Sequence, residues 1–268
     1  MIPRRFTLFA FMEIAIIVFA SLVASLLTFF SGFGLGTILM PVFALFFPVE
    51  IAVALTGVVH LLNNLFKVGL VGKQASWGVV LRFGIPAIAG AFVGARLLLR
   101  ASDFEPLAAY AIGERQFFIT PVKLVIALLL IFFSLMEVVP SLKKMQFGKD
   151  KMIWGGLLSG FFGGLSGHQG ALRSAFLVRA GLSKEAFIGT GVIIACCIDV
   201  SRLAVYFNRY TGIEVRENRG LLLAATLAAV AGALAGNRLL KKITLSFIQN
   251  IITVMLLALA AALGAGLI

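Results

Sequence analysis

The two halves of this 268-residue chain carry the same sequence landmarks in the same order. The recurring pairs are GAFVGARLL at 90–98 and GALAGNRLL at 232–240, SGFGLG at 31–36 and SGHQGA at 166–171, and Thr56-Gly57-Val58 and Thr190-Gly191-Val192. A repeat of this kind indicates that one structural unit occurs twice. We therefore divide the chain into a first repeat at 1–139, a polar linker at 140–151 and a second repeat at 152–268.

The composition indicates that most of this chain is surrounded by lipid. Hydrophobic residues make up 61% of the chain and charged residues 13%, whereas a soluble domain is about half apolar and about a quarter charged. The net charge of +12 comes mostly from lysines and arginines in loops and at segment ends, where cations meet lipid phosphates. We therefore expect a multi-pass protein of the cell membrane, of the bacterial inner-membrane type, with no nucleic-acid partner.

Charges and Gly/Pro clusters divide the chain into about ten apolar segments, five in each half. They cover 6–30, 37–47, 50–71, 78–99 and 117–139, then 152–165, 171–181, 185–208, 219–240 and 245–267. Helices are predicted because a span in lipid must satisfy its own backbone hydrogen bonds, so the expected fold class is all-α, with full-length and half-membrane helices. An odd number per half makes the second half enter from the opposite side, which predicts two inverted five-helix repeats. The polar stretch 100–116 is expected to hold a short amphipathic helix.

A glycine-rich break precedes a short apolar segment in each half. The glycines in 31–36 and 163–170 are too dense for a stable helix, and a broken helix at membrane depth is tolerated where it lines a cavity. The short helices that follow would aim backbone N–H groups and positive dipole ends at an anion. The alternative is that these glycines only allow close helix packing. The candidate substrate-binding residues are Ser31, Gly34, Gly36, Thr37, Asn63, Asn64, Ser166, His168, Gln169, Gly170 and Arg173.

Polar side chains also recur on the segment after each short helix. In the first half they are Thr56, His60, Asn63, Asn64 and Lys67, most of which share one helix face. In the second half, Asp199 and His168 are candidate proton carriers, because both titrate and both are expected at membrane depth. The alternatives are that Asp199 only neutralises Arg202, three residues further on, that His168 has a packing role, and that Lys67 extends to the lipid headgroups.

Nothing in the sequence is typical of an enzyme, a metal site or a cofactor site. HExxH and GxSxG motifs are absent, and GFGLG lacks the downstream residues of a phosphate-binding or dinucleotide-binding loop. Cys196 and Cys197 are adjacent in an apolar segment and are expected to act as small core residues. We therefore expect no catalytic activity, no metal and no cofactor.

Three stretches are similar to a known family of membrane proteins. They are SGFGLGTILMP at 31–41, FPVEIAVALTG at 47–57 and GLLSGFFGGLSGHQGALRSAFLVRAGLSKEAFIGTG at 156–191. In these stretches and in its two similar halves, the chain resembles the TauE/SafE family of sulfite-exporter-like permeases. The resemblance implies movement of small anions, often sulfur-containing ones such as sulfite and organosulfonates, driven by a proton or other ion gradient.

We therefore expect a secondary transporter for a small sulfonate-like or sulfite-like anion, bound near the membrane midplane between the repeats. The expected partners are this anion, the lipid bilayer, and H⁺ or another coupling ion. The alternatives are a passive anion channel, which needs a continuous pore with weak repeated sites, and a membrane-embedded enzyme or non-transporting subunit.

Overall fold

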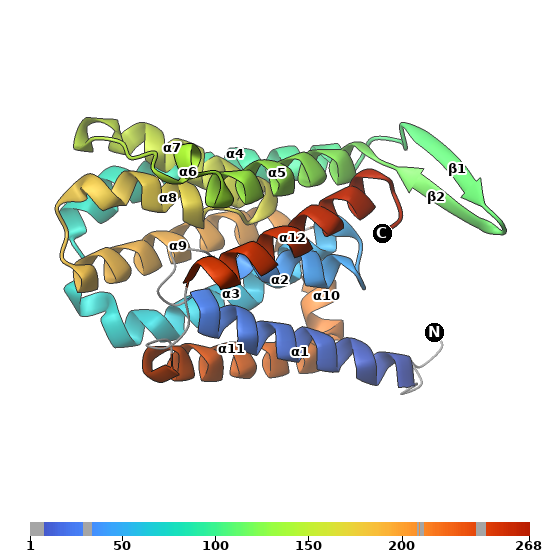
Figure 1. Cartoon of the computed structure of the whole chain (residues 1–268), viewed down its shortest axis with the longest axis horizontal. Coiled ribbons are helices and arrows are strands. Elements are labelled where there is room, and N and C mark those ends of the chain that lie inside the picture. Colours follow the sequence, from blue (N-terminus) through green and yellow to red (C-terminus); the bar gives the residue numbers. More distant parts are fainter. Residues whose placement is uncertain (1–7, 29–33, 208, 210–211, 240–244) are drawn as a thin grey trace.

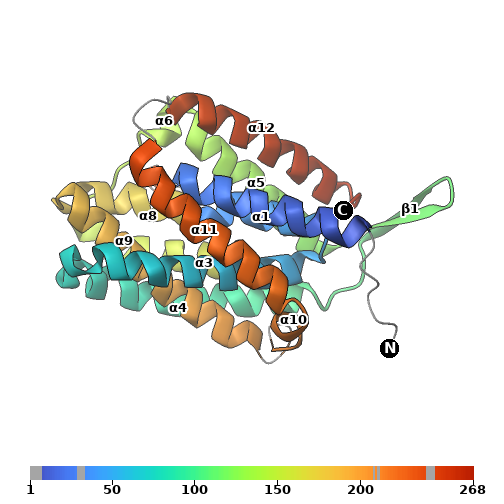
Figure 2. The same ribbon diagram turned by 90° about the horizontal axis from the view of Figure 1, so that it is seen from below.

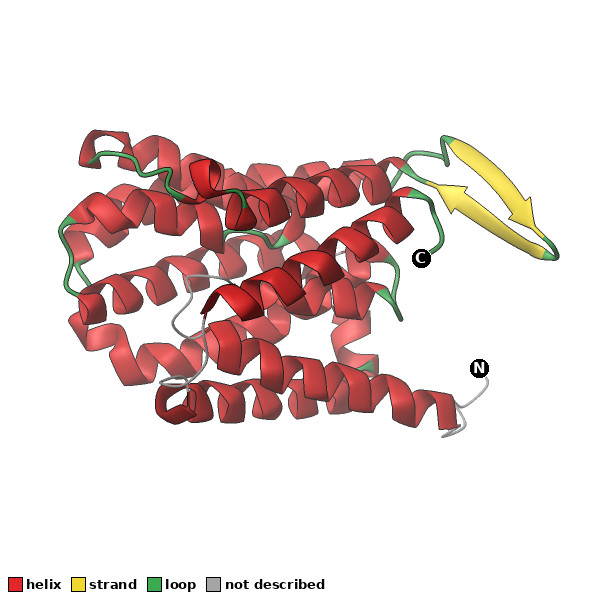
Figure 3. Ribbon diagram, viewed as in Figure 1, coloured by secondary structure: helices red, strands yellow, loops and turns green. Residues whose placement is uncertain are grey.

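A computed structural model describes residues 8–28, 34–207, 209, 212–239 and 245–268, which form a helical bundle with one β-hairpin (Figures 1 and 3). The main helices of the first half are α1 (Leu8–Thr28), α2 (Leu35–Ala44), α3 (Val49–Val71), α4 (Trp77–Ala101) and α5 (Pro121–Val138). Those of the second half are α7 (Met152–Ser166), α8 (Gly170–Leu177), α9 (Lys184–Tyr206), α11 (Arg219–Leu239) and α12 (Leu245–Gly264). Shorter turns are η1 (Gly72–Gln74), α6 (Pro140–Lys143), η2 (Lys149–Lys151), η3 (Val178–Ala180) and α10 (Gly212–Glu217).

Five helices within the described residues are long and apolar enough to cross a membrane. These spans are Phe11–Thr28, Val49–Gln74, Trp77–Ala101, Lys184–Tyr206 and Arg219–Gly236. Large apolar side chains such as Phe19 and Leu81 remain exposed on the outside of the bundle, at 70% and 55% of their surface. Lipid tails are as apolar as these side chains, so their exposure costs little in a bilayer. The chain is a multi-pass membrane protein.

Local sequence signals determine where helices α5 and α9 begin. Pro121 occupies the first turn of α5, where its missing N–H leaves no hydrogen bond unmade. The hydroxyl of Thr120 caps the same helix by accepting from the backbone N–H of Lys123 at 3.3 Å. Ser183 caps α9 in the same way, accepting from the N–H of Ala186 at 3.2 Å. Side-chain caps therefore mark the first residues of α5 and α9.

The expected amphipathic helix in 100–116 is wrong, because this region leads into a β-hairpin. Strands β1 (Ala108–Ile112) and β2 (Arg115–Ile119) pair antiparallel. Gly113 opens the two-residue loop between them with φ +61°, a left-handed conformation that glycine adopts freely and that matches the twist of a hairpin. The missed signal is a glycine-led loop between two short runs of residues that favour strands. The protein is therefore nearly, but not wholly, all-α.

The hairpin projects beyond the end of the bundle where α12 finishes (Figure 1). The Tyr110 hydroxyl donates to the carbonyl oxygen of Ala265 at 2.6 Å, and Tyr110 stacks on Phe117 across the hairpin. These contacts anchor the hairpin to the C-terminal end of α12.

The repeated glycine motif brings helices of opposite halves into backbone contact. Gly90 and Gly94 place α4 against the backbone of α7, and Gly232 and Gly236 place α11 against the backbone of α1. A Cβ atom at any of these positions would collide with a backbone carbonyl group, so small residues are required for this approach. The duplicated motif therefore makes one contact twice, between the fourth main helix of one half and the first of the other (Figure 2).

Helices α3 and α9 pack against each other in opposite directions. Gly57 in the first half of α3 lies against Arg202 near the end of α9, and Gly189 near the start of α9 lies against Val71 at the end of α3. Both helices contain 23 residues, and their first residues stand at positions 49 and 184, a spacing of 135. These two helices, which occupy the same place in each half, are thus antiparallel neighbours.

The two glycine-rich breaks lie next to each other. Helix α2 begins directly after Gly34, so the expectation of a non-helical chain throughout 31–36 is wrong at Gly36, where the helix has already formed. The second break is only 167–169, so the expectation of a break throughout 163–170 is wrong at Gly163 and Gly164, which lie in α7, and at Gly170, which begins α8. Gly167, at φ +84°, ends α7. A Cβ atom at Gly36 would lie 3.3 Å from the carbonyl oxygen of Gly167. The breaks therefore approach each other backbone to backbone.

Candidate functional site

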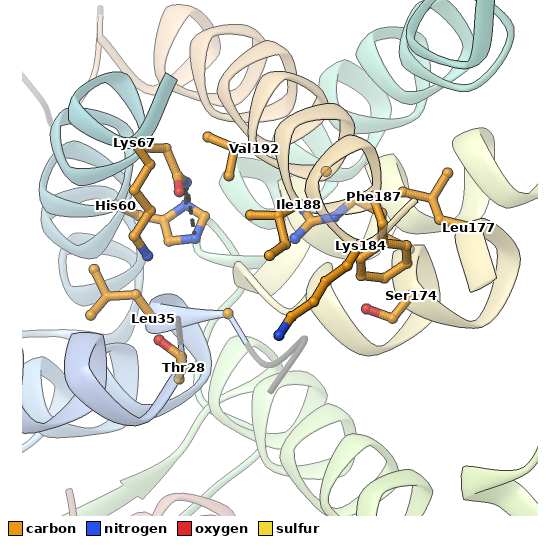
Figure 4. A pocket seen from close by; sticks show the side chains of 14 residues that line it. Thr28, Leu35, His60, Lys67, Ser174, Leu177, Lys184, Phe187, Ile188 and Val192 are labelled. Carbon is orange, nitrogen blue, oxygen red and sulfur yellow. Dashed lines mark hydrogen bonds between the residues drawn. The ribbon is translucent and has the colours of Figure 1, made fainter. Parts of the chain in front are cut away.

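A cavity of about 290 Å³ lies beside the two breaks, between α2, α3, α8 and α9. It is lined by Thr28, Gly34, Leu35, His60, Asn64, Lys67, Arg173, Ser174, Leu177, Lys184, Phe187, Ile188, Gly191 and Val192. Figure 4 shows His60 and Lys67 on one side of this cavity and Lys184, Phe187 and Ile188 on the other. Both halves of the chain therefore contribute to its wall.

Basic side chains dominate the polar part of the wall. Lys67 comes from α3, Arg173 from α8 and Lys184 from the start of α9, while His60 and Asn64 add further nitrogen atoms from α3. No aspartate or glutamate is among the described residues that line the cavity. Lys67 is only 7% exposed, so it does not extend to the headgroups and its charge is held inside the bundle. A cavity with this charge and partly apolar walls concentrates anions.

Next to the cavity, the buried carboxylate of Asp199 has three polar partners. Its Oδ2 lies 2.5 Å from Nδ1 of His60, and its Oδ1 accepts from Nε of Arg202 at 3.0 Å and from Nε2 of Gln169 at 3.4 Å. These four side chains are almost wholly buried. A carboxylate held away from water needs such compensation, and the expected pairing of Asp199 with Arg202 is present.

Gln169 connects this carboxylate to the cavity. Its Oε1 accepts from Nη1 of Arg173 at 3.0 Å, while its Nε2 donates to Asp199. Its backbone carbonyl accepts from the Ser159 hydroxyl at 3.1 Å, which fixes the break against α7. The amide side chain of Gln169 therefore contacts both the guanidinium of Arg173 at the cavity and the buried carboxylate of Asp199.

The candidate residues of the first break and of α3 take different positions. Gly34 and Asn64 line the cavity, and Gly36 and Thr37 are buried in the first turn of α2 beside it. Asn63 faces α1 instead, where the Ser25 hydroxyl lies 3.5 Å from its Oδ1. Ser31 falls outside the described residues.

The candidates of the second break divide in the same way. Arg173 lines the cavity, and Gly170 is the first residue of α8. His168 is buried and does not line the cavity; its ring stacks on Phe133 at 5.6 Å between centroids. Its Nδ1 lies 3.1 Å from both the hydroxyl and the carbonyl oxygen of Ser166. Its surroundings are thus those of a packed aromatic side chain.

Three basic residues of the cavity wall, His60, Lys67 and Lys184, were not among the candidate substrate-binding residues. The polar series on the third segment contained the signal for the first two, because residues four and seven apart share a helix face. Lys184 stands at the first position of α9, and the sequence offers no pattern that places this residue near Arg173. Among the described residues, no group of three His, Cys, Asp or Glu side chains could hold a metal ion.

Comparison with known proteins identifies one match. A family model described as "Sulfite exporter TauE/SafE" matches residues 17–263. No curated protein and no solved structure matches the chain significantly. The family match covers both halves, both breaks and every residue of the cavity wall.

Proposed function

The chain belongs to the sulfite exporter TauE/SafE family, and we propose that it is a secondary transporter for a small sulfite-like or sulfonate-like anion in a bacterial-type inner membrane. The observation that carries this proposal is the charge of the cavity. Lys67, Arg173 and the exposed Lys184 bring positive charge to one cavity, and none of the described residues that line it carries a carboxylate. An anion in this cavity would be attracted by all three cations, and Coulomb interactions at a partly buried site are stronger than in water.

Arg173 is suited to hold the anionic group of the substrate. Its guanidinium is already oriented by Gln169, and its planar fork can donate two parallel hydrogen bonds to a sulfonate or carboxylate. Lys67 and Lys184 would add point charges, and the amide of Asn64 a neutral donor. The apolar side chains of Leu35, Phe187 and Ile188 would exclude water from the complex.

The proposed architecture is a pair of inverted repeats with the substrate between them. The antiparallel packing of α3 against α9 supports it, because a two-fold axis in the membrane plane reverses the direction of each helix. The paired contacts of α4 with α7 and of α11 with α1 also support it, since they exchange under such an axis. Motion of one repeat against the other would expose the cavity to each side of the membrane in turn.

Asp199 remains a candidate proton carrier in this proposal, and its contact with His60 makes that imidazole a second one. A proton taken up by this pair would change the charge next to the anion site, which is the condition for coupling two fluxes. His168, which stacks on Phe133 away from the cavity wall, is the third candidate.

Transport by the purified protein in proteoliposomes tests the proposal. We expect saturable counterflow of sulfite or methanesulfonate, and accumulation driven by an imposed ion gradient. Arg173→Gln should weaken substrate binding about thirtyfold, which corresponds to about 2 kcal/mol. The matched control is Arg179→Gln, because Arg179 is exposed just beyond α8 and bonds to Gln146 instead of the cavity.

Two results would contradict the proposal. Anion flux that never accumulates against a gradient would identify a channel instead of a transporter. Equal weakening by Arg173→Gln and Arg179→Gln would show that the cavity does not hold the anion.

A further inference from the structure

We infer that Arg202 is the cation of a second anion-binding station, which faces the side of the membrane opposite to the Lys67 cavity and which Asp199 occupies in the present conformation. This inference rests on the proposed transport function and extends it to a residue that does not line the cavity. The ligand is the same small oxyanion, bound through a guanidinium.

The repeat makes Arg202 the counterpart of Lys67. Arg202 follows Lys67 by 135 residues, which is also the spacing between the first residues of α3 and α9. Because α3 and α9 are antiparallel, the two cations lie toward opposite ends of the helix pair. A transporter with inverted repeats opens equivalent sites to opposite sides of the membrane, so the position that holds Lys67 in one state corresponds to Arg202 in the other.

The guanidinium of Arg202 is fully buried and has unused donor capacity. Its Nε donates to Asp199, and its Nη2 lies 2.8 Å from the same carboxylate oxygen, but its Nη1 has no hydrogen-bond partner among the described residues. The hydroxyl of Thr56, one residue before Gly57 on α3, is likewise buried without a partner there. An unsatisfied buried donor is costly, and an oxyanion at Nη1 would satisfy that of Arg202.

Glycines from α3 and from the second break leave room around this guanidinium. A Cβ atom at Gly57 would lie 3.3 Å from Cζ of Arg202, and one at Gly167 would lie 3.0 Å from its Nη1. The unpartnered nitrogen therefore points at the backbone of the break, close to where Gly36 and Gly167 meet. A small movement of one break relative to α9 would open a space at that nitrogen.

The first-half residues that correspond to the cavity-lining residues of the second half are buried and leave no matching cavity wall exposed. The counterparts of Arg173, Ser174 and Leu177 at the same spacing are Ile38, Leu39 and Val42 of α2, and that of Ile188 is Val53 of α3. Each of these counterparts is 6% exposed or less. The structure is thus open at Lys67 and closed at Arg202, the asymmetry that alternating access requires.

Asp199 supplies the negative charge that the anion would bring. When the carboxylate pairs with Arg202, that cation is neutralised and the closed side is stable. Transfer of the anion to Arg202 would replace the carboxylate, leaving Asp199 to His60. Arg202 can therefore pair with the substrate or with Asp199, but not with both at once.

Counterflow of labelled methanesulfonate tests the inference, because exchange needs no net driving force. The Asp199→Asn variant should retain counterflow, since Arg202 is then free to accept the anion. The double variant Asp199→Asn/Arg202→Gln should lose it by about tenfold or more, and Asp199→Asn/Arg202→Lys, which restores a cation, should regain part of it. Removal of both members of a buried ion pair is usually tolerated, and thermal unfolding in detergent will show whether each variant is folded.

The inference would be overturned if the double variant showed more counterflow than Asp199→Asn alone. If Arg202 only neutralises Asp199, the single variant leaves an uncompensated buried charge, and the double variant will be the more stable and the more active. Loss of counterflow in both Asp199→Asn and the double variant would also overturn it. Absence of counterflow in the unmodified protein would instead refute the proposed function itself.

Discussion

The imidazole Nδ1 of His60 lies 2.5 Å from Oδ2 of Asp199, which links the two antiparallel helices at the centre of the bundle. His60 also lines the cavity, whereas Asp199 does not. One contact therefore connects the proposed anion site to the buried ion pair of Asp199 and Arg202. This chain of contacts gives a physical route by which protonation and anion binding can influence each other.

His60 and His168 form a matched pair of histidines for testing proton coupling. The charged groups around His60 are Asp199 and Arg202 of α9 and Arg173 of α8. We expect His60→Gln to flatten the dependence of the transport rate on pH, because the variant removes the titratable side chain that contacts Asp199 and lines the cavity. Initial rates in proteoliposomes at fixed membrane potential measure this dependence.

The same measurement on His168→Gln provides the control. His168 packs against Phe133, so we expect this variant to change thermal stability while the shape of the pH profile stays that of the unmodified protein. A flattened profile in His168→Gln and an unchanged one in His60→Gln would assign the proton to the second break.

Lys67 should contribute to affinity through its charge. Replacing a buried cation that contacts an anion typically costs about 1.5–3 kcal/mol, so Lys67→Met should weaken anion binding by about tenfold or more. Lys73→Met is the comparison, since Lys73 lies exposed just beyond the end of α3. Anion-dependent thermal stabilisation in detergent gives both affinities. Equal affinities in the two variants would place the anion away from Lys67.

Apolar length and glycine spacing predict much of this fold, because both depend on local physics. A segment such as 50–71 must be helical in lipid, and α3 begins within one residue of that segment. Glycine density predicted breaks at 31–36 and 163–170, but α2 already begins at Leu35 and the second break is only 167–169, because α7 continues through Ser166 and α8 begins at Gly170. Residues 31–33 lie outside the described residues. The hairpin at 108–119 differs from the expected amphipathic helix because its short strands depend on a two-residue loop, which helical periodicity does not reveal.

The cavity was predictable only in part, because it depends on which helices meet. Arg173, Asn64 and Gly34 were found from their place at or near the breaks. His60 was recognised as polar, but its pairing with Asp199 joins residues 139 apart in the chain, and local spacing carries no such information. Lys184 requires the approach of α9 to α8, which only the packed structure provides.

Asp103 and Arg209 pair at the ends of α4 and α9, outside the spans. Nη1 of Arg209 donates to Oδ2 of Asp103 at 2.8 Å, and this hydrogen bond lowers the pKa of Asp103. A lowered pKa means that the stability from this pair is present above the ordinary aspartate pKa of about 3.9 and is lost as the pH falls through the folded-state value. Asp103→Asn should therefore unfold at a slightly lower temperature than the unmodified protein at neutral pH, and the difference should vanish in acid.

Because both side chains are about half exposed, at 42% for Arg209 and 52% for Asp103, salt should weaken the effect. Thermal unfolding of both proteins across pH and ionic strength measures it. A difference that persists below the titration of Asp103 would mean that the aspartate stabilises this corner by something other than its charge.

Gly160 and Gly69 test whether the glycines of the bundle are needed for helix contact. A Cβ atom at Gly160 of α7 would collide with the backbone of Ala87 on α4, whereas one at Gly69 of α3 would meet nothing within 4 Å. Overpacking typically costs about 1–3 kcal/mol, and a collision with backbone leaves no rotamer to relieve it, so Gly160→Ala should lower the free energy of unfolding by at least this amount. Gly69→Ala should be neutral or stabilising, because alanine favours a helix over glycine by about 0.5–1 kcal/mol. Unfolding in detergent micelles measures both; a neutral Gly160→Ala would show that α4 and α7 are held together by other contacts.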